Sequence, residues 1–170
     1  LFRETWPNGL NSLVGDLGTW VVTNLNQQTN PGVETTPDGY GIVAFNGGTG
    51  VANGEFVSPA FDLSDYAIVD GNHQADDKRK TTTRVFMKLW LGTRQLDSNG
   101  EVLQVQFSPD NGTTWYTVAT SQDRLSTDRF TMVSADLSPY ILETSTQAKI
   151  RFYMPWLAQN GDYMRIGRIW

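Results

Sequence analysis

The chain has 170 residues, no cysteine, and 18 acidic against 13 basic residues. This acidic balance argues against a partner that is recognised through its phosphate backbone, such as a nucleic acid. Without cysteine there is no disulfide framework and no thiolate-ligated metal. No apolar window approaches the length of a membrane-spanning helix, so we expect no membrane insertion.

In chain order, the sequence is a succession of short β-branched and aromatic runs, and no long segment carries a helical period. Turn-forming pairs such as Asp38-Gly39 and Asn160-Gly161 separate these runs. The pattern predicts strands over residues 19–24, 40–46, 55–61, 84–91, 102–108, 115–119, 129–135, 149–154 and 163–170. Many short strands of this kind predict an all-β fold, a jelly-roll β-sandwich of two antiparallel sheets with little helix. We expect a single β-sandwich domain over residues 1–170, excised from a longer polypeptide.

The segment 108–115 predicts a hairpin between two of these strands. Its Asn111-Gly112 pair suits the positive φ values at the centre of a tight turn. We expect Asp110 to accept hydrogen bonds from amides of the turn, and Trp115 to hold the turn against the next strand. The letters S-x-D-x-G-x-T-W resemble the Asp-box hairpin, which recurs in sialidase propellers and occurs singly in secreted β-sandwich modules. A single copy argues against a propeller built from repeats.

Alternation in the second half of the chain separates the two faces of three strands. One face is apolar and should form the core; its residues are Val85, Met87, Leu89, Leu91, Leu103, Val105, Phe107, Ala148, Ile150, Phe152 and Met154. The opposite face mixes aromatic rings with long hydrogen-bonding side chains. We expect the three strands to lie in one sheet, which would join these polar faces into one surface.

Such a surface suits carbohydrate. Trp and Tyr rings stack on the apolar patches of sugars, while Gln, Arg and Lys hydrogen-bond to the hydroxyl groups. The sequence therefore predicts a ligand-binding face formed by Arg84, Lys88, Trp90, Gln104, Gln106, Arg151 and Tyr153. Two simpler interpretations stay open: a loop covers this face, or the Arg and Lys stems merely overlie an outer sheet surface.

Acidic residues gather in and beside the polar loop of residues 69–83. Calcium takes six to eight oxygen ligands, and loops are able to wrap it. We therefore predict a structural Ca²⁺ site that draws on Glu4, Asp62, Asp70, Asp76 and Asp77. The alternative is a solvated acidic loop, whose charge is balanced by Lys78, Arg79 and Lys80.

The sequence offers no recognisable catalytic arrangement. Glycoside hydrolysis needs two carboxylates that face a cleft, whereas the acids after residue 84 stand mainly at strand ends or in turns. There is no Gly-x-Ser-x-Gly elbow and no phosphate-binding loop. The single histidine, His73, lies in a polar loop and cannot form a two-histidine metal site. We therefore expect a protein without enzymatic activity.

Several short motifs follow one another in a recognisable order. They are Phe2-x-Glu4 with Trp6-Pro7-Asn8-Gly9, Gly18-x-Trp20, Phe56-Val57-Ser58-Pro59-Ala60-Phe61-Asp62-Leu63-Ser64, the Asp110 hairpin, Asp136-Leu137-Ser138-Pro139-Tyr140, and Lys149-Ile150-Arg151-Phe152. This order resembles the MAM-like and cleaved-adhesin-like jelly-roll modules of bacterial surface and secreted proteins, which are similar in fold to many carbohydrate-binding modules. The resemblance implies ligand recognition or adhesion, with no shared catalytic residues.

Together these features predict a non-catalytic binding or adhesion module for carbohydrate, located outside the cell, at a cell surface or on a virion. Its partners would be a surface glycan and neighbouring domains of the same polypeptide. The alternative is a structural or interaction jelly roll, as in a phage capsid or an adhesin spacer, whose outer face is buried against another chain. A hydrolase or a lyase is disfavoured by the missing carboxylate pair.

Overall fold

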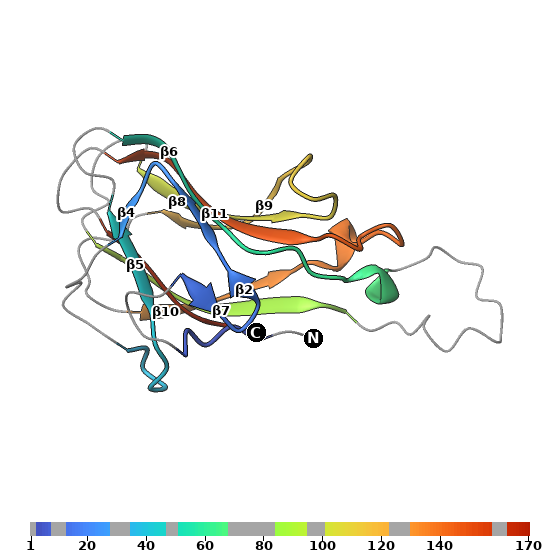
Figure 1. Cartoon of the computed structure of the whole chain (residues 1–170), viewed down its shortest axis with the longest axis horizontal. Helices are drawn as coiled ribbons and strands as arrows, with labels where there is room; N and C mark the ends of the chain where they lie inside the picture. Colours follow the sequence, from blue (N-terminus) through green and yellow to red (C-terminus); the bar gives the residue numbers. More distant parts are fainter. Residues whose placement is uncertain are drawn as a thin grey trace.

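The computed structural model is built almost entirely from β-strands that pack in two layers (Figure 1). It describes residues 3–7, 13–27, 35–46, 51–67, 84–94, 101–122, 130–157 and 163–170. Over these ranges helix is limited to two 3₁₀ turns, η1 (Ser64–Tyr66) and η2 (Ser138–Tyr140), and no helix there has the length and apolar character needed to cross a bilayer. The predicted all-β sandwich with little helix is confirmed.

Two five-stranded antiparallel sheets form the layers. The β7 sheet has the order β10-β7-β12-β5-β4, with β10 (Phe130–Asp136), β7 (Phe86–Arg94), β12 (Tyr163–Ile169), β5 (Val43–Asn46) and β4 (Asn26–Gln27). The β8 sheet has the order β3-β6-β11-β8-β9, with β3 (Val21–Thr23), β6 (Val51–Val57), β11 (Lys149–Leu157), β8 (Val102–Ser108) and β9 (Tyr116–Gln122). A separate hairpin pairs β1 (Val14–Gly15) with β2 (Gly18–Thr19).

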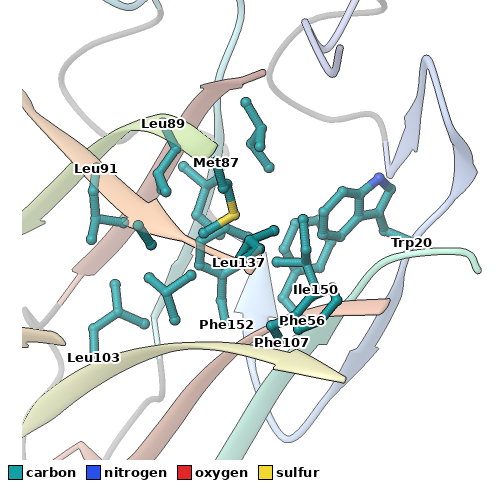
Figure 2. Packing of buried hydrophobic residues seen from close by; sticks show 14 of the residues in the cluster. Trp20, Phe56, Met87, Leu89, Leu91, Leu103, Phe107, Leu137, Ile150 and Phe152 are labelled. Carbon is teal, nitrogen blue, oxygen red and sulfur yellow. The ribbon is translucent and has the colours of Figure 1, made fainter. Parts of the chain in front are cut away.

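One hydrophobic core lies between the two sheets (Figure 2). Every residue that alternation assigned to the core is buried, from Val85, which directly precedes β7, to Met154 on β11. Trp6, Trp20 and Phe56 add an aromatic cluster, in which the rings of Trp20 and Phe56 stack with centroids 4.7 Å apart. Removal of this apolar surface from water is the main force that holds the layers together. The side chains on the outer faces of the two sheets are therefore not needed for this core and are available for contact with a ligand or a partner.

The prediction that three strands share one sheet is wrong. β8 and β11 are neighbours in the β8 sheet, but β7 lies in the opposite layer, between β10 and β12. Both sheets turn their apolar faces to the same core. Alternation therefore predicts which side chains of a strand face the core, but it does not predict which of the two sheets the strand belongs to. The polar face of β7 consequently lies on the other side of the sandwich from the polar faces of β8 and β11.

The predicted hairpin connects β8 to β9. Asn111 and Gly112 both have positive φ, 59° and 90°. One carboxylate oxygen of Asp110 accepts hydrogen bonds from the backbone N–H of Thr114 and from the hydroxyl of Ser108, both at 2.8 Å. These bonds, the one from Thr114 above all, favour the ionised carboxylate and hold the pKa of Asp110 below its ordinary value.

Candidate functional site

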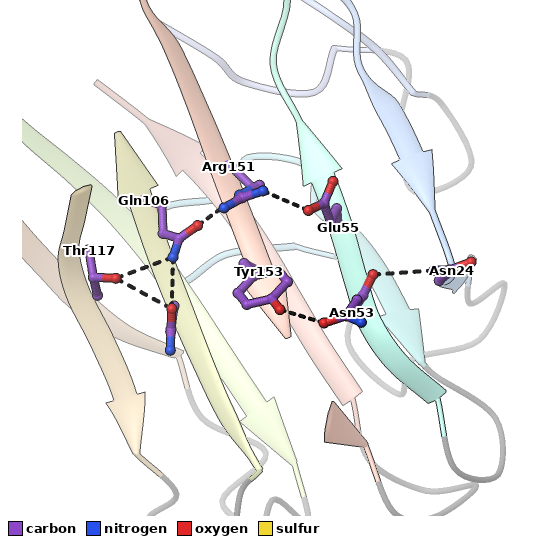
Figure 3. Close-up of polar contacts among 8 residues, drawn as sticks. Asn24, Asn53, Glu55, Gln106, Thr117, Arg151 and Tyr153 are labelled. Carbon is purple, nitrogen blue, oxygen red and sulfur yellow. Dashed lines mark hydrogen bonds and ion pairs between the residues drawn. The ribbon is translucent and has the colours of Figure 1, made fainter. Parts of the chain in front are cut away.

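The outer face of the β8 sheet carries a polar network in which two groups of hydrogen bonds, one around Arg151 and one around Tyr153, are linked by the contact of Arg151 with the Tyr153 ring (Figure 3). Gln104 and Gln106 lie on β8, and Arg151 and Tyr153 lie on the neighbouring β11. The register places Gln106 beside Arg151 and Gln104 beside Tyr153. Alternate residues on paired strands share a face, so the structure brings these four predicted ligand residues together.

Arg151 is the centre of the network. Its Nε–H donates to Oε1 of Gln106 at 2.7 Å, and its Nη1 donates to Oε1 of Glu55 on β6 at 2.6 Å. Its guanidinium also lies over two rings, 4.2 Å from the centroid of Trp115 and 4.8 Å from that of Tyr153. Only 16% of the side chain is exposed. Charge-assisted hydrogen bonds and cation–π contacts therefore hold the guanidinium against both rings.

Gln106 links β8 to both of its neighbours. Its Oε1 accepts from Arg151, and its Nε2 donates to Oε1 of Gln104 at 2.8 Å and to the hydroxyl of Thr117 at 3.2 Å. The Thr117 hydroxyl donates in turn to the same oxygen of Gln104 at 3.3 Å. Gln106 is only 7% exposed, and these partners satisfy its polar atoms. Its role is to position the residues around it.

Tyr153 stands between amide side chains from the two neighbouring strands. Its hydroxyl donates to Oδ1 of Asn53 on β6 at 2.6 Å, and Gln104 lies beside it on β8. Asn53 and Gln104 are acceptors in these bonds, so their amide NH₂ groups donate to no residue that the structure describes. Tyr153 and Gln104 are half-buried and Asn53 is exposed. The result is an aromatic ring with an available hydrogen-bond donor on each side.

The backbone at Asn53 is unusual for a strand. Its φ of 56° lies in the left-handed region, as does the φ of 54° at Asn24, whose Nδ2 donates to the backbone oxygen of Asn53 at 3.4 Å. Gly54 follows, and a Cβ added there would lie 2.4 Å from a methyl carbon of Leu25. Asparagine tolerates this conformation better than most residues. In this conformation the Asn53 side chain lies where its Oδ1 accepts the hydrogen bond from the Tyr153 hydroxyl.

The remaining predicted ligand residues are on the opposite surface. Arg84 precedes β7, is 68% exposed, and pairs with Asp136 at 3.6 Å. Lys88 is exposed, and Trp90 is half-buried. A Cβ added to Gly167 of β12 would lie 3.0 Å from the Cβ of Trp90, so this tryptophan packs closely on the neighbouring strand. None of these three residues belongs to the network on the β8 sheet.

A second stacked arginine lies near Trp90. The guanidinium of Arg168 lies 4.6 Å from the ring centroids of both Tyr40 and Trp170, and its Nη1 is 3.4 Å from Oδ2 of Asp38. The two outer surfaces thus carry the same type of arrangement, an arginine that contacts two rings and has a carboxylate partner. The Arg168–Asp38 pair therefore offers a matched control for changes made at Arg151 and Glu55.

Glu4, the first predicted calcium ligand, is fully buried. Its carboxylate accepts four hydrogen bonds, from the backbone N–H groups of Trp6 (3.1 Å), Asp16 (2.9 Å) and Leu17 (3.3 Å) and from Nε1 of Trp20 (3.2 Å). Calcium binds oxygen atoms, and N–H donors around both oxygens of Glu4 do not fit a cation at this position. Glu4 instead ties the β1–β2 hairpin to the core.

Asp62, the second of these predicted ligands that the structure describes, is exposed and caps a turn. It accepts from the Ser64 hydroxyl at 2.7 Å and from the Ser64 backbone N–H at 2.8 Å, and these bonds lower its pKa. The described ranges contain no group of three or more His, Asp or Glu side chains that could hold a metal ion. Asp70, Asp76 and Asp77 lie outside the described residues, so the calcium site stays a prediction.

No protein-family model matches the sequence, and the search among curated proteins finds no match. Solved structures match over nearly the whole chain. The K2 cleaved adhesin domain of Lys-gingipain superposes with a TM-score of 0.55 at 11% identity, over 99% of this chain and 96% of that domain. TmCBM61, solved with β-1,4-galactotriose, gives 0.54 at 12% identity, over 99% and 97%. The CBM22-1 xylan-binding domain of Paenibacillus barcinonensis Xyn10C gives 0.52 at 11% identity, over 99% and 91%.

The chain is a jelly roll of the cleaved-adhesin and carbohydrate-binding-module type. This confirms the resemblance to cleaved adhesins that the order of motifs predicted. At these identities the likeness shows the fold alone, and the likeness to MAM modules stays a prediction.

Sequence reasoning missed Asn53, Glu55 and Thr117 in this adhesin-like jelly roll. Asn53-Gly54 has the letters of a turn, so the predicted strand begins at residue 55, whereas β6 begins at Val51. The bond between Glu55 and Arg151 joins residues 96 positions apart and depends on the pairing of β6 with β11. The one available signal was the Asn-Gly pair itself, which marks unusual backbone inside a strand as well as in a turn.

Proposed function

We propose that this jelly roll is a non-catalytic carbohydrate-binding module that acts outside the cell, within a larger surface, secreted or viral protein. The observation that carries the proposal is the ring of Tyr153 with an available amide donor on each side, from Gln104 and Asn53. Solved modules of the same fold, among them a xylan-binding domain and a module in complex with galactotriose, support it.

The proposed site needs little rearrangement to bind. Arg151 and Gln106 already hold the Tyr153 ring and the Gln104 amide in place, and a preorganised site loses less conformational freedom on binding. A hydroxyl hydrogen bond gains little because it replaces one with water. We therefore infer that ring stacking provides most of the affinity and that the amides provide orientation.

The chemistry of the face supports binding without reaction. The strands of the β8 sheet contain one carboxylate, Glu55, and it is bonded to Arg151. Canonical glycoside hydrolysis uses two carboxyl groups that flank the scissile bond. A single, paired carboxylate is better suited to holding a binding surface in shape.

Alanine substitutions on the two opposite surfaces test the proposal. We expect Tyr153→Ala to weaken binding of the best neutral glycan found on an array by roughly 1–3 kcal/mol, the scale of aromatic stacking on nucleobases. Trp90→Ala removes a half-buried ring from the β7 sheet and should leave the affinity unchanged. Titration calorimetry measures the affinity, and circular dichroism checks the fold. The reverse result would move the site to the β7 sheet, and no effect of either change would refute sugar binding at both faces.

The second candidate is an interaction module, which the exposed apolar side chains on the outer surface of the β7 sheet favour. Phe86 and Met132 are each 48% exposed, and Met132 pairs directly with Trp90 between β10 and β7. Large exposed apolar side chains on adjacent strands are typical of surfaces that are buried against another domain. If this is the function, no glycan on the array is retained, and Trp90→Ala weakens association with the neighbouring domain of the parent polypeptide.

A further inference from the structure

Residues on the outer face of the β8 sheet already occupy the groups of Arg151 that a ligand would contact. Its Nε–H bonds to Gln106, its Nη1 bonds to Glu55, and its guanidinium lies over two rings. A ligand carboxylate would have to displace Glu55 to reach it. Glu55 would then keep its charge without a partner in a partly buried position, 27% exposed, which is strongly unfavourable.

Glu55 also lies where it would meet the ligand. It is the direct cross-strand partner of Tyr153 in the pairing of β6 with β11, so its carboxylate is next to the ring on which a sugar would stack. The charge of the nearby Arg151 guanidinium is already balanced by Glu55, so the pair offers an anionic sugar no net attraction. Close approach of such a group to the Glu55 carboxylate would place like charges together, which costs binding free energy.

Among the described residues beside Tyr153 on β6, β8 and β11, the groups other than Glu55 and Arg151 are uncharged. The amides of Gln104 and Asn53 and the hydroxyl of Thr117 suit neutral hydroxyl groups. Lys149 is a second cation on β11, four residues from Tyr153, or about 14 Å at the rise of a strand. That separation exceeds the screening length of about 8 Å at physiological ionic strength. Lys149 therefore does little to attract an anion to the Tyr153 ring.

We propose that Glu55 determines specificity, and that it restricts the β8 face to uncharged glycans by neutralising Arg151 and repelling acidic sugars. This inference rests on the proposed function. It gives the Glu55–Arg151 pair a role in rejecting the wrong ligand as well as in holding the network together.

Affinity electrophoresis tests the inference with polysaccharides that share a backbone and differ in charge. The probes are hydroxyethylcellulose with carboxymethylcellulose, and methyl-esterified with free polygalacturonate. We expect the unmodified protein to bind the neutral member of a pair at least about tenfold more tightly than the acidic member, in line with the cost of one unpaired like-charge contact. Glu55→Gln keeps an acceptor for Arg151 and removes the charge, and it should bring the two affinities within about threefold.

Asp38→Asn is the matched control, because it removes one charge from the equivalent pair with Arg168 on the opposite surface. It should leave the preference unchanged. Melting temperatures confirm that each variant is folded. Equal binding of both members by the unmodified protein, or a preference that Glu55→Gln does not reduce, would overturn this inference alone. Absence of binding to every neutral glycan, both on the array and among these probes, would overturn the proposed function and this inference with it.

Discussion

Gln104 and Gln106 are the same residue type, two positions apart on β8, and the network gives them different roles. Gln106 is nearly buried and bonds to Arg151, Gln104 and Thr117. Gln104 is half-buried and keeps its amide NH₂ group available. The role of each residue is set by its neighbours on β9 and β11, which residue type alone does not reveal.

Alanine substitution should separate these roles. Gln106→Ala removes the partner of three polar groups and should lower the free energy of unfolding by about 1–3 kcal/mol. Gln104→Ala should change it by no more than about 0.5 kcal/mol and should weaken glycan binding modestly. Denaturant unfolding and titration calorimetry measure the two quantities. A Gln104→Ala protein that proves the less stable of the two would contradict the assigned roles.

The β8–β9 hairpin links stability to the ionisation of Asp110. Hydrogen bonds from Thr114 and Ser108 lower the pKa of this carboxyl below its ordinary value of 3.8. The unfolded chain lacks these bonds, so its Asp110 titrates at the ordinary value. A group whose pKa is lowered by folding stabilises the protein fully above the unfolded pKa, and this contribution is lost as the pH falls through the folded pKa.

Asp110→Asn should therefore make unfolding less sensitive to acid. The variant should be less stable than the unmodified protein at pH 7, and the difference should shrink below a pH of about 4. Melting temperatures of both proteins at neutral pH and at steps down to about pH 2 provide the comparison. A constant difference over the whole range would show that the charge of Asp110 contributes nothing to the hairpin.

For the secondary-structure elements, the sequence predicts where the strands are better than it predicts how they are arranged in sheets. Alternation identifies the inward side chains of β7, β8 and β11, because burial acts on each strand separately. It cannot assign β7 to a sheet, since both sheets face the same core. Tyr153 and Gln104 were predicted together correctly only because β11 and β8 are paired, whereas Trp90 was placed with them and lies on the other surface. Asn53 and Glu55 depend on the pairing of β6 with β11, which no local pattern contains.

For the whole molecule, calcium remains a prediction that now depends on Asp62 and on the acids of the loop 69–83. Glu4 is occupied by N–H donors, which leaves Asp62, Asp70, Asp76 and Asp77 as the proposed ligands. An ion that binds only the folded state stabilises it by mass action. We expect a higher melting temperature in millimolar calcium than in chelator, and no such difference in an Asp76→Asn/Asp77→Asn variant. Equal melting temperatures of the unmodified protein in both conditions would eliminate the calcium site.

The bridge between Glu4 and Ile169 determines how the module would respond to mechanical load. The two backbones exchange hydrogen bonds of 2.8 and 2.9 Å in an antiparallel arrangement. In such a pair, the backbone before Glu4 and the backbone after Ile169 leave in the same direction. Tension applied at Arg3 and Trp170 would therefore peel this contact open one bond at a time, and would not shear all the rungs of a sheet together. The strands β6, β11 and β8, which carry the proposed site, lie in the other sheet, so opening of the Glu4–Ile169 bridge would leave the proposed binding face intact.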